Sequence, residues 1–265
     1  MDRLTKAIKT AKNDQPISDL GSAIEHDPNT GFGQTIPVST EHLLVNKVVA
    51  CNLSNPISEI YRLLRTRILK IMDQNGWKTL GISGPTPSSG KSLTATNLAI
   101  AIAMKPGNSA LLIDADLRKA GTTELLGIEY RYGLEDFLSS SASMEKVVIN
   151  PGIDKLGVMI NNRPINGSSD LLMSQKMGAL IHYIKSKKDN LVGIFDMPPV
   201  LVADDAVALS SLLDAVLLVV DSTQTNKRDL EKSLELMKDQ NIIGCVLNKA
   251  EGVDTTLSSY GYGEY

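Results

Sequence analysis

Residues that could bind phosphate follow an apolar segment of the sequence. The segment TLGIS leads into GPTPSSGKS at residues 84–92, and the helical pattern KSLTATNLAIAIAM begins within that loop. A strand, a glycine-rich loop and a helix in this order bind phosphates, because backbone N–H groups and the helix N-terminus face the ligand. Lys91 would reach the β- and γ-phosphates of a nucleotide, and the Ser92 hydroxyl would bind Mg2+. One departure from the usual spacing is that Pro85 stands where the first glycine is expected, one residue after Gly84.

Carboxylates follow two further apolar segments. ALLIDADLRK ends a predicted strand in Asp114 and Asp116, which share a face because residues i and i+2 of a strand point the same way. LVGIFDMPP ends another predicted strand in Asp196. The carboxyl ends of parallel strands form the edge where ligands bind. We expect Asp114 and Asp116 to bind Mg2+ or to accept a proton from an attacking hydroxyl, and Asp196 to orient Mg2+ through water.

The segment NKAE, which begins at Asn248, follows the last predicted strand. It resembles the guanine-reading motif Asn-Lys-x-Asp, but Glu251 has one methylene more than aspartate, which favours ATP over GTP. Asn248 could contact the base, or it could be an ordinary loop residue after a strand. The predicted catalytic residues are Lys91, Asp114, Asp116 and Asp196, and the predicted Mg2+ ligands are Ser92, Asp116 and Asp196. The predicted nucleotide contacts are Gly84, Ser88, Ser89, Gly90, Lys91, Ser92, Leu93 and Asn248.

Short apolar segments alternate with helical patterns in the part of the chain that positions these residues. The predicted strands are TLGIS, ALLID, LGVMI, LVGIFD, AVLLVVD and IIGCVLN. Predicted helices begin at Pro56 and cover residues 91–104, 169–187, 205–212 and 227–239. The helix at Pro56 is expected to have Ser58 as its cap and an apolar stripe formed by Ile60, Leu64, Ile68 and Ile71. Strands that are apolar on both faces predict an α/β, doubly wound, mainly parallel sheet with helices on both faces, the P-loop NTPase fold.

We divide the chain into three parts. Residues 1–45 are predicted to form an N-terminal helix and an irregular arm, residues 46–250 a P-loop domain, and residues 251–265 a flexible tail. Arg3, Lys6, Lys9 and Lys12 surround a narrow apolar face in the first helix, which could bind an acidic membrane surface or a partner. Alternatively, this helix could be frayed or docked on its own domain.

Composition excludes several classes of protein. The net charge of −3 argues against a predominantly basic nucleic-acid binder, so we expect no nucleic-acid partner. No stretch reaches the roughly 18 apolar residues of a transmembrane helix, and the N-terminus lacks the apolar region of a signal peptide. The two cysteines, Cys51 and Cys245, lie far apart and fit a reducing compartment. We expect a cytoplasmic protein, peripheral at the inner membrane only through a partner.

Four features together resemble the bacterial tyrosine kinases of exopolysaccharide and capsule synthesis, which are relatives of the MinD and ParA ATPases. They are the long glycine loop, the segment LLIDADLRK, the segment IFDMPPVLVADDA, and a Glu-x-x-Arg-x-x-Arg motif within EIYRLLRT. The resemblance covers about residues 55–265. It implies an ATP- and Mg2+-dependent protein-tyrosine autokinase, and it favours Asp114 as the base.

The resemblance also assigns roles outside the nucleotide site. Glu59, Arg62 and Arg65 correspond to the family's oligomerisation motif and imply a homo-oligomeric ring, although such a triplet alone would be read as a solvated helix face. Three of the seven tyrosines lie in the last six residues, and the family phosphorylates such a cluster between subunits. These tyrosines are Tyr260, Tyr262 and Tyr265. The implied activator is a separate, membrane-embedded protein of the chain-length-determinant type.

Two other functions remain open at this point. The first is an ATP-driven positioning switch like MinD and ParA; Thr86 stands where those proteins carry a signature lysine, which argues against this function. The second is a non-enzymatic, ATP-binding regulator of polysaccharide export. An ATP-binding chain without phosphotyrosine would favour the regulator.

Overall fold

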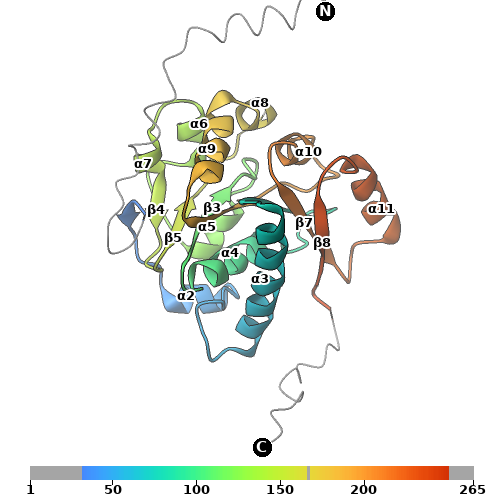
Figure 1. Cartoon of the computed structure of the whole chain (residues 1–265), viewed down its shortest axis with the longest axis horizontal. Coiled ribbons are helices and arrows are strands. Elements are labelled where there is room, and N and C mark those ends of the chain that lie inside the picture. The colour runs from blue at the N-terminus through green and yellow to red at the C-terminus, as the bar shows by residue number, and fades with distance from the viewer. Residues whose placement is uncertain (1–31, 166–167, 251–265) are drawn as a thin grey trace, which may run out of the picture.

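The computed structural model describes residues 32–165 and 168–250, which contain one mixed sheet and the helices that cover it (Figure 1). The strands are β1 (Gln34–Thr35), β2 (Thr79–Ser83), β3 (Asn108–Asp114), β4 (Val148–Asn150), β5 (Leu156–Met159), β6 (Asn190–Asp196), β7 (Ala215–Asp221) and β8 (Ile242–Asn248). The helices are α2 (Thr40–Val45), α3 (Pro56–Asn75), α4 (Lys91–Ala103), α5 (Gly121–Leu126), α6 (Leu134–Leu138), α7 (Met144–Val147), α8 (Ser168–Leu172), α9 (Gln175–Ser186), α10 (Asp205–Ser210) and α11 (Lys227–Leu236).

The sheet has the order β1-β4-β5-β3-β6-β2-β7-β8, and every pair of neighbours is parallel except β4 and β5. This confirms the predicted α/β, doubly wound, mainly parallel sheet. The six predicted strands correspond to β2, β3, β5, β6, β7 and β8.

Side chains of successive strand residues enter two separate apolar cores, one on each face of the sheet. Along β3, Ala110 and Leu112 join the core with α2, α3, α4 and α5, whereas Leu111 and Ile113 join the core with α6 to α10. Successive strand residues point to opposite faces, so a strand that is apolar at every position needs helices on both sides. The continuous apolar segments of the sequence therefore account for the two helical layers.

Helix α3 differs from the expected helix in its cap and in its buried face. Its N-cap is Asn55, whose side chain accepts a hydrogen bond from the Ile57 backbone N–H, and Pro56 occupies the first turn. Ser58, the predicted cap, is buried and donates to the Asn55 carbonyl at 2.7 Å. The predicted apolar stripe is wrong at Ile60, which is 44% exposed; the fully buried apolar residues of α3 are Ile68, Leu69 and Met72.

The predicted helix at residues 169–187 is two helices. Helix α8 ends at Leu172, and α9 begins after Ser174, whose hydroxyl accepts a hydrogen bond from the Met177 backbone N–H at 3.3 Å. A serine that caps a new helix N-terminus satisfies a backbone donor that a continuous helix would pair elsewhere. Periodicity across the two helices concealed this break.

The expectation of an irregular arm up to residue 45 is wrong for its last part. Residues 34–35 form β1 on β4, residues 40–45 form α2, and Phe32 is buried against Gly157 of β5. The backbone N–H groups of Val49 and Ala50 both donate to the side-chain oxygen of Asn97 in α4, at 2.8 and 2.9 Å. Long-range contacts order this segment, and they leave no periodic signal in such short elements. The boundary at residue 46 remains a proposal.

One carboxylate joins the starting ends of two neighbouring strands. Asp214, before β7, accepts hydrogen bonds from the backbone N–H groups of Lys78 and Thr79 at 2.9 and 3.0 Å. Its other oxygen lies 2.7 Å from Lys185 Nζ of α9. Burial alone would raise the pKa of Asp214, but the hydrogen bonds from Lys185, Lys78 and Thr79 outweigh burial and hold the pKa below its ordinary value.

Replacement of Asp214 with asparagine should therefore destabilise the fold by about 2 kcal/mol at pH 7, because a charged acceptor of several hydrogen bonds is lost. The folded-state pKa is lowered, so this contribution is present above the unfolded-state pKa and is lost as pH falls through the folded-state value. Urea unfolding of the parent and Asp214→Asn at pH 7 and pH 3 measures the difference. An equal difference at both pH values would contradict this assignment.

Candidate nucleotide-binding site

Three adjacent strands bring the predicted site residues to one edge of the sheet. The order β3-β6-β2 places the ends of the two aspartate-bearing strands beside the strand that leads into the phosphate loop, residues 84–92. Asp114 and Asp196 are paired residues of β3 and β6, and both side chains are fully buried. Asp116 follows β3 and is also buried. The structure thus brings together the three segments that the sequence singled out.

The glycines of the phosphate loop are required by close backbone and side-chain contacts. A Cβ on Gly84 would overlap the carbonyl oxygen of Val219 in β7, which explains why glycine stands at 84 although proline occupies the usual position. Gly90 has a φ of +94°, and a Cβ there would overlap the side-chain amide of Asn248. Ser88 also has a positive φ, of 60°. Such a loop turns its successive N–H groups toward one side, which suits an anion.

Lys91 and Ser92 begin helix α4 and face the aspartates. Lys91 is only 6% exposed, and its ammonium is close enough to Asp116 and Asp196 to offset part of the pKa increase that burial causes in each carboxyl group. The Ser92 hydroxyl lies near Asp196 and favours the ionised form of that carboxyl group, against the larger effect of burial on its pKa. A Cβ added at Gly121 would lie 2.6 Å from Ser92 Oγ, so the start of α5 packs directly against this hydroxyl.

Thr122 forms hydrogen bonds with both buried carboxylates, although no sequence motif predicted it as a site residue. Its backbone N–H donates to Asp114 Oδ2 at 3.2 Å, and its hydroxyl donates to Asp196 Oδ2 at 3.4 Å. Helix α5, which carries Thr122, spans only residues 121–126. The sequence feature that could have predicted this role is the Gly-Thr-Thr segment shortly after the Asp-x-Asp pair. A turn there must return the chain to the sheet edge.

Burial dominates the electrostatics of the three aspartates. Burial, followed by the nearby charges of Asp196 and Asp116, raises the pKa of Asp114 well above its ordinary value. Burial raises the pKa of Asp196 to about 6, and it also raises that of Asp116. One carboxylate oxygen each of Asp114 and Asp196 and the Ser89 hydroxyl are buried without a protein partner in the described structure. Unpaired oxygens of this kind suit hard, oxygen-seeking cations.

The donor set therefore fits Mg2+ bound together with nucleotide phosphates. Ser92, Asp116 and Asp196 offer oxygen ligands only, as Mg2+ prefers. Within residues 32–165 and 168–250, no three His, Cys, Asp or Glu side chains form a metal-binding group by themselves. Phosphate oxygens and water would complete the coordination shell, as is usual for Mg2+ in proteins.

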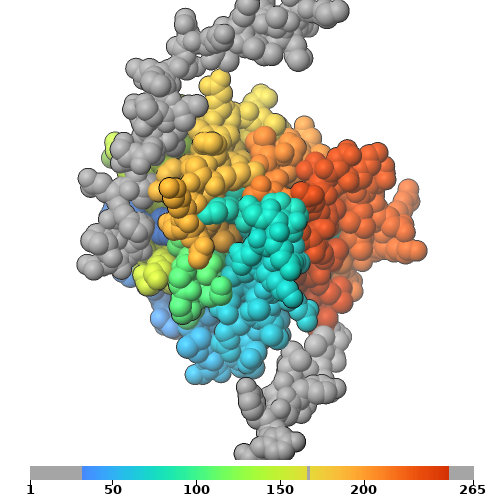
Figure 2. Space-filling model, in the orientation of Figure 1, coloured from blue at the N-terminus to red at the C-terminus, as the bar shows by residue number. Residues whose placement is uncertain are grey.

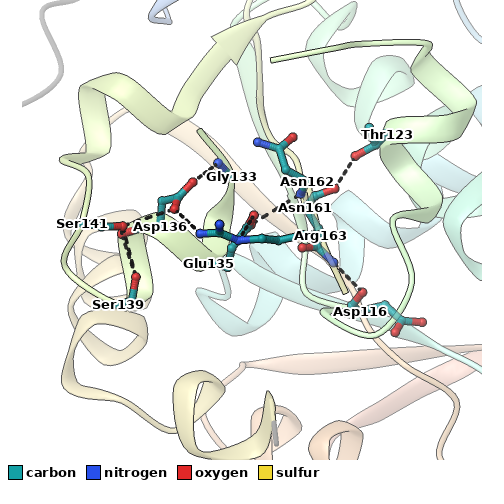
Figure 3. A network of polar contacts seen from close by, with 10 residues as sticks. All are labelled: Asp116, Thr123, Gly133, Glu135, Asp136, Ser139, Ser141, Asn161, Asn162 and Arg163. Carbon is teal, nitrogen blue, oxygen red and sulfur yellow. Dashed lines mark hydrogen bonds and ion pairs between the residues drawn. The ribbon is translucent and has the colours of Figure 1, made fainter. Parts of the chain in front are cut away.

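A polar network holds the Asp116 loop from behind (Figure 3). Asn161, after β5, donates from Nδ2 to the Asp116 carbonyl at 3.1 Å, and its own carbonyl accepts from the Thr123 hydroxyl at 2.9 Å. Further along the same loop, Arg163 pairs with Asp136 of α6 at 2.7 Å. Asn161 is fully buried, so this support of the Asp116 backbone is shielded from water.

The remaining predicted site residues lie in different places. Leu93 is in the first turn of α4, and Asn248 Nδ2 donates to the Ser89 carbonyl at 2.9 Å. In α3, Glu59 pairs with Arg62 at 3.4 Å, whereas Arg65 turns inward and donates to the Ala101 carbonyl of α4 at 3.0 Å. Tyr260, Tyr262 and Tyr265 lie outside the described residues. No helix of the described chain has the length and apolarity needed to cross a membrane.

Comparison with known proteins identifies the family. No family model matches the chain. The chain is 33% identical over 207 residues to tyrosine-protein kinase YwqD of Bacillus subtilis, covering 77% of the chain and 85% of YwqD. The chain belongs to the bacterial tyrosine-kinase family. Other relatives are longer: the match to tyrosine-protein kinase Wzc of Salmonella typhimurium is 32% identical and covers 78% of the chain but 29% of Wzc.

Members of the bacterial tyrosine-kinase family also share the three-dimensional fold. The kinase domain of Escherichia coli tyrosine kinase ETK superposes with a TM-score of 0.71 at 26% identity, covering 89% of this chain and 95% of that domain. The chimerical protein CapA2B2 gives the same TM-score at 27% identity, with 88% and 96% covered. EpsB of Ralstonia solanacearum is 31% identical, but the chain spans only 29% of its length. MinD of Pyrococcus horikoshii, at 19% identity and a TM-score of 0.54, shares the fold alone.

Replacement of Asp196 with asparagine should stabilise the ligand-free chain near neutral pH. The pKa of Asp196 is raised from 3.8 to about 6, so ionisation of the folded protein costs stability as pH rises through this interval. The gain is expected to be roughly 2–3 kcal/mol at pH 7 and close to zero at pH 4. Urea unfolding of both proteins in a chelator measures it. A loss of stability at pH 7 would show that Asp196 is already well compensated without a cation.

Proposed function

We propose that this chain is an ATP-dependent protein-tyrosine kinase that phosphorylates Tyr260, Tyr262 and Tyr265 between subunits and thereby regulates exopolysaccharide polymerisation or export. The observation that carries the proposal is the pairing of Asp114 with Asp196 beside a phosphate loop. Its relatives YwqD and Wzc are named tyrosine-protein kinases. The chain spans 85% of YwqD but only 29% of Wzc.

The residues of the site divide the chemistry between them. The phosphate-loop N–H groups and Lys91 bind the β- and γ-phosphates of ATP, with Gly84, Ser88, Ser89, Gly90, Ser92 and Leu93 forming the loop and the first helical turn. Ser92, Asp116 and Asp196 would hold Mg2+, which would supply positive charge to the phosphates. The tyrosine oxygen forms its bond to the γ-phosphorus while the bond to the leaving ADP oxygen breaks.

The tyrosine proton passes to a carboxylate at the end of β3. Asp114 and Asp116 both qualify, and burial raises the pKa of each, so each is a stronger proton acceptor when it is ionised. The unpaired Oδ1 of Asp114 offers a free acceptor atom. The family resemblance favours Asp114 for this role.

Helix α3 supports the proposed ring. Ile57, Ile60 and Leu63 are 47%, 44% and 46% exposed, and they alternate with the Glu59–Arg62 ion pair on the same stretch of helix. Figure 2 shows α3 at the surface, in cyan. Exposed apolar side chains next to charges are typical of interfaces between subunits. We therefore propose that this stretch of α3 forms the subunit contact, and that a separate membrane-embedded activator brings the cytoplasmic ring to the inner membrane.

Replacement of Ile60 with glutamate should weaken self-association by roughly tenfold or more, because a charge enters an apolar contact. Leu236→Glu is a matched control, since Leu236 is 47% exposed but lies on α11. Sedimentation velocity over a range of concentrations measures both variants. Equal association of parent and Ile60→Glu would contradict the proposed interface.

Replacement of Lys91 with methionine should reduce tail phosphorylation by roughly 100-fold or more, because the phosphates lose their buried cation. Mass spectrometry of the C-terminal peptide, from parent and variant chains made in the native host, measures this. Phosphate on the parent tail alone supports the kinase. An unmodified tail in both, while polysaccharide is being made, would contradict tail autophosphorylation and favour an ATP-dependent switch or a non-enzymatic regulator.

A further inference from the structure

The last residue of β8, Asn248, and the residue after it, Lys249, both contact the phosphate loop. Asn248 Nδ2 donates to the carbonyl of Ser89 at 2.9 Å, and Lys249 Nζ donates to the carbonyl of Ser88 at 2.8 Å. The Lys249 ammonium also lies 2.7 Å from Oδ2 of Asp221, at the end of β7. Two successive carbonyl groups of the loop are therefore held by two successive residues that lie about 160 positions later in the sequence.

These contacts fix the direction of the N–H groups that a phosphate would need. In a trans peptide unit the carbonyl and the following N–H point in opposite directions, and none of the described peptide bonds is cis. A Ser88 carbonyl turned toward Lys249 thus turns the Ser89 N–H away from β8, and a Ser89 carbonyl turned toward Asn248 does the same for the Gly90 N–H. Successive N–H groups on one side form the concave arrangement that binds anions.

Within the described residues, the other half of the loop is held through backbone groups. Val200 N–H donates to the Gly84 carbonyl at 2.9 Å, and Leu201 N–H donates to the Pro85 carbonyl at 3.2 Å. The first half of the loop is therefore held by backbone groups of the segment after β6. The second half is held by the side chains of Asn248 and Lys249, so its support can be removed by substitution.

The Asp221 carboxylate holds the Lys249 ammonium in place. Asp221 is 1% exposed, and its second oxygen accepts hydrogen bonds from the backbone N–H and the hydroxyl of Thr223 at 2.9 and 2.7 Å. The hydrogen bond from Lys249, followed by those from Thr223, lowers the pKa of Asp221 to about 2. The carboxylate is therefore ionised at physiological pH and gives the ammonium a fixed partner.

Gly90 shows that the two segments fit one another sterically. A Cβ at residue 90 would overlap Asn248 Nδ2, so the amide occupies the space that any other residue type would need. An asparagine that packs this closely against the loop has its amide nitrogen committed to the Ser89 carbonyl rather than directed at a base.

We propose that Asn248, Lys249 and Asp221 are positioning residues that preorganise the second half of the phosphate loop for binding phosphate. The consequence for nucleotide binding rests on the proposed function, but the orientation of the loop does not. Under this proposal Asn248 and Lys249, at the end of β8, act through the loop backbone and not through the purine. Their effect on binding is therefore the same for ligands with and without a base.

Hydrogen–deuterium exchange of the ligand-free full chain tests the positioning directly. Lys249→Met and Asp221→Asn should each accelerate exchange of loop amides within residues 84–92 by about tenfold. Lys249→Met removes the donor to the Ser88 carbonyl, and Asp221→Asn removes the charge that holds this donor in place. Lys249→Arg should restore part of the protection, and exchange in residues 108–114 should stay unchanged. Lys238→Met is the matched control, since Lys238 forms an exposed ion pair with Glu235. Unchanged loop exchange in both Lys249→Met and Asp221→Asn would overturn the proposal, whether or not the chain binds nucleotide.

Binding of ADP and of pyrophosphate distinguishes positioning from base recognition. Asn248→Ala and Lys249→Met should weaken both ligands by the same factor, about tenfold. A loss confined to ADP would overturn the proposal in favour of base reading by Asn248. A parent chain that binds neither ligand would contradict the proposed function, and the exchange measurement would still decide the positioning role.

Discussion

Two buried carboxylates at paired positions of adjacent strands set the constraint on which the rest of the site depends. Asp114 and Asp196 lie side by side at the ends of β3 and β6. Two like charges in a buried place are costly, so the structure must surround them with donors and cations. Thr122 donates hydrogen bonds to both carboxylates, and Lys91, at the end of the phosphate loop that follows β2, places its positive charge near Asp196. The sheet order β3-β6-β2 thus gathers buried negative charge, which a metal ion bound with a nucleotide would neutralise.

Helix α4 connects the nucleotide site to helix α3 at the surface of the molecule. It begins at Lys91 in the phosphate loop, and near its other end the Ala101 carbonyl accepts a hydrogen bond from Arg65 of α3. In its middle, Asn97 binds the backbone of Val49 and Ala50, shortly before α3. The two helices lie side by side (Figure 1). The nucleotide site and the exposed face of α3 therefore belong to one packed unit, in which the Arg65–Ala101 hydrogen bond joins α3 to α4.

The sequence predicted the parts of this account that depend on local pattern. Continuous apolar segments give strands covered on both sides, and aspartates at their ends fall on one edge once the strands are parallel. Sequence could not supply the contacts that depend on register and loop path. Thr122 reaches both carboxylates because α5 begins beside them, and Asn161 supports Asp116 from the segment after β5. Arg65 was expected on an open charged face, and only the packing of α3 on α4 turns it inward.

Transfer of phosphate between two differently disabled chains tests the central claim most directly. One chain carries Lys91→Met and an intact tail; the other carries phenylalanine at Tyr260, Tyr262 and Tyr265 and an intact site. Mixed with ATP and Mg2+, the pair should yield phosphate on the tail of the Lys91→Met chain, because the intact site of one subunit acts on the tail of its neighbour. If the tail of the Lys91→Met chain carries no phosphate in the mixture, under conditions where the parent chain becomes phosphorylated on its tail, transfer between subunits would be contradicted. A parent chain without phosphate on its tail would contradict the proposed autokinase activity.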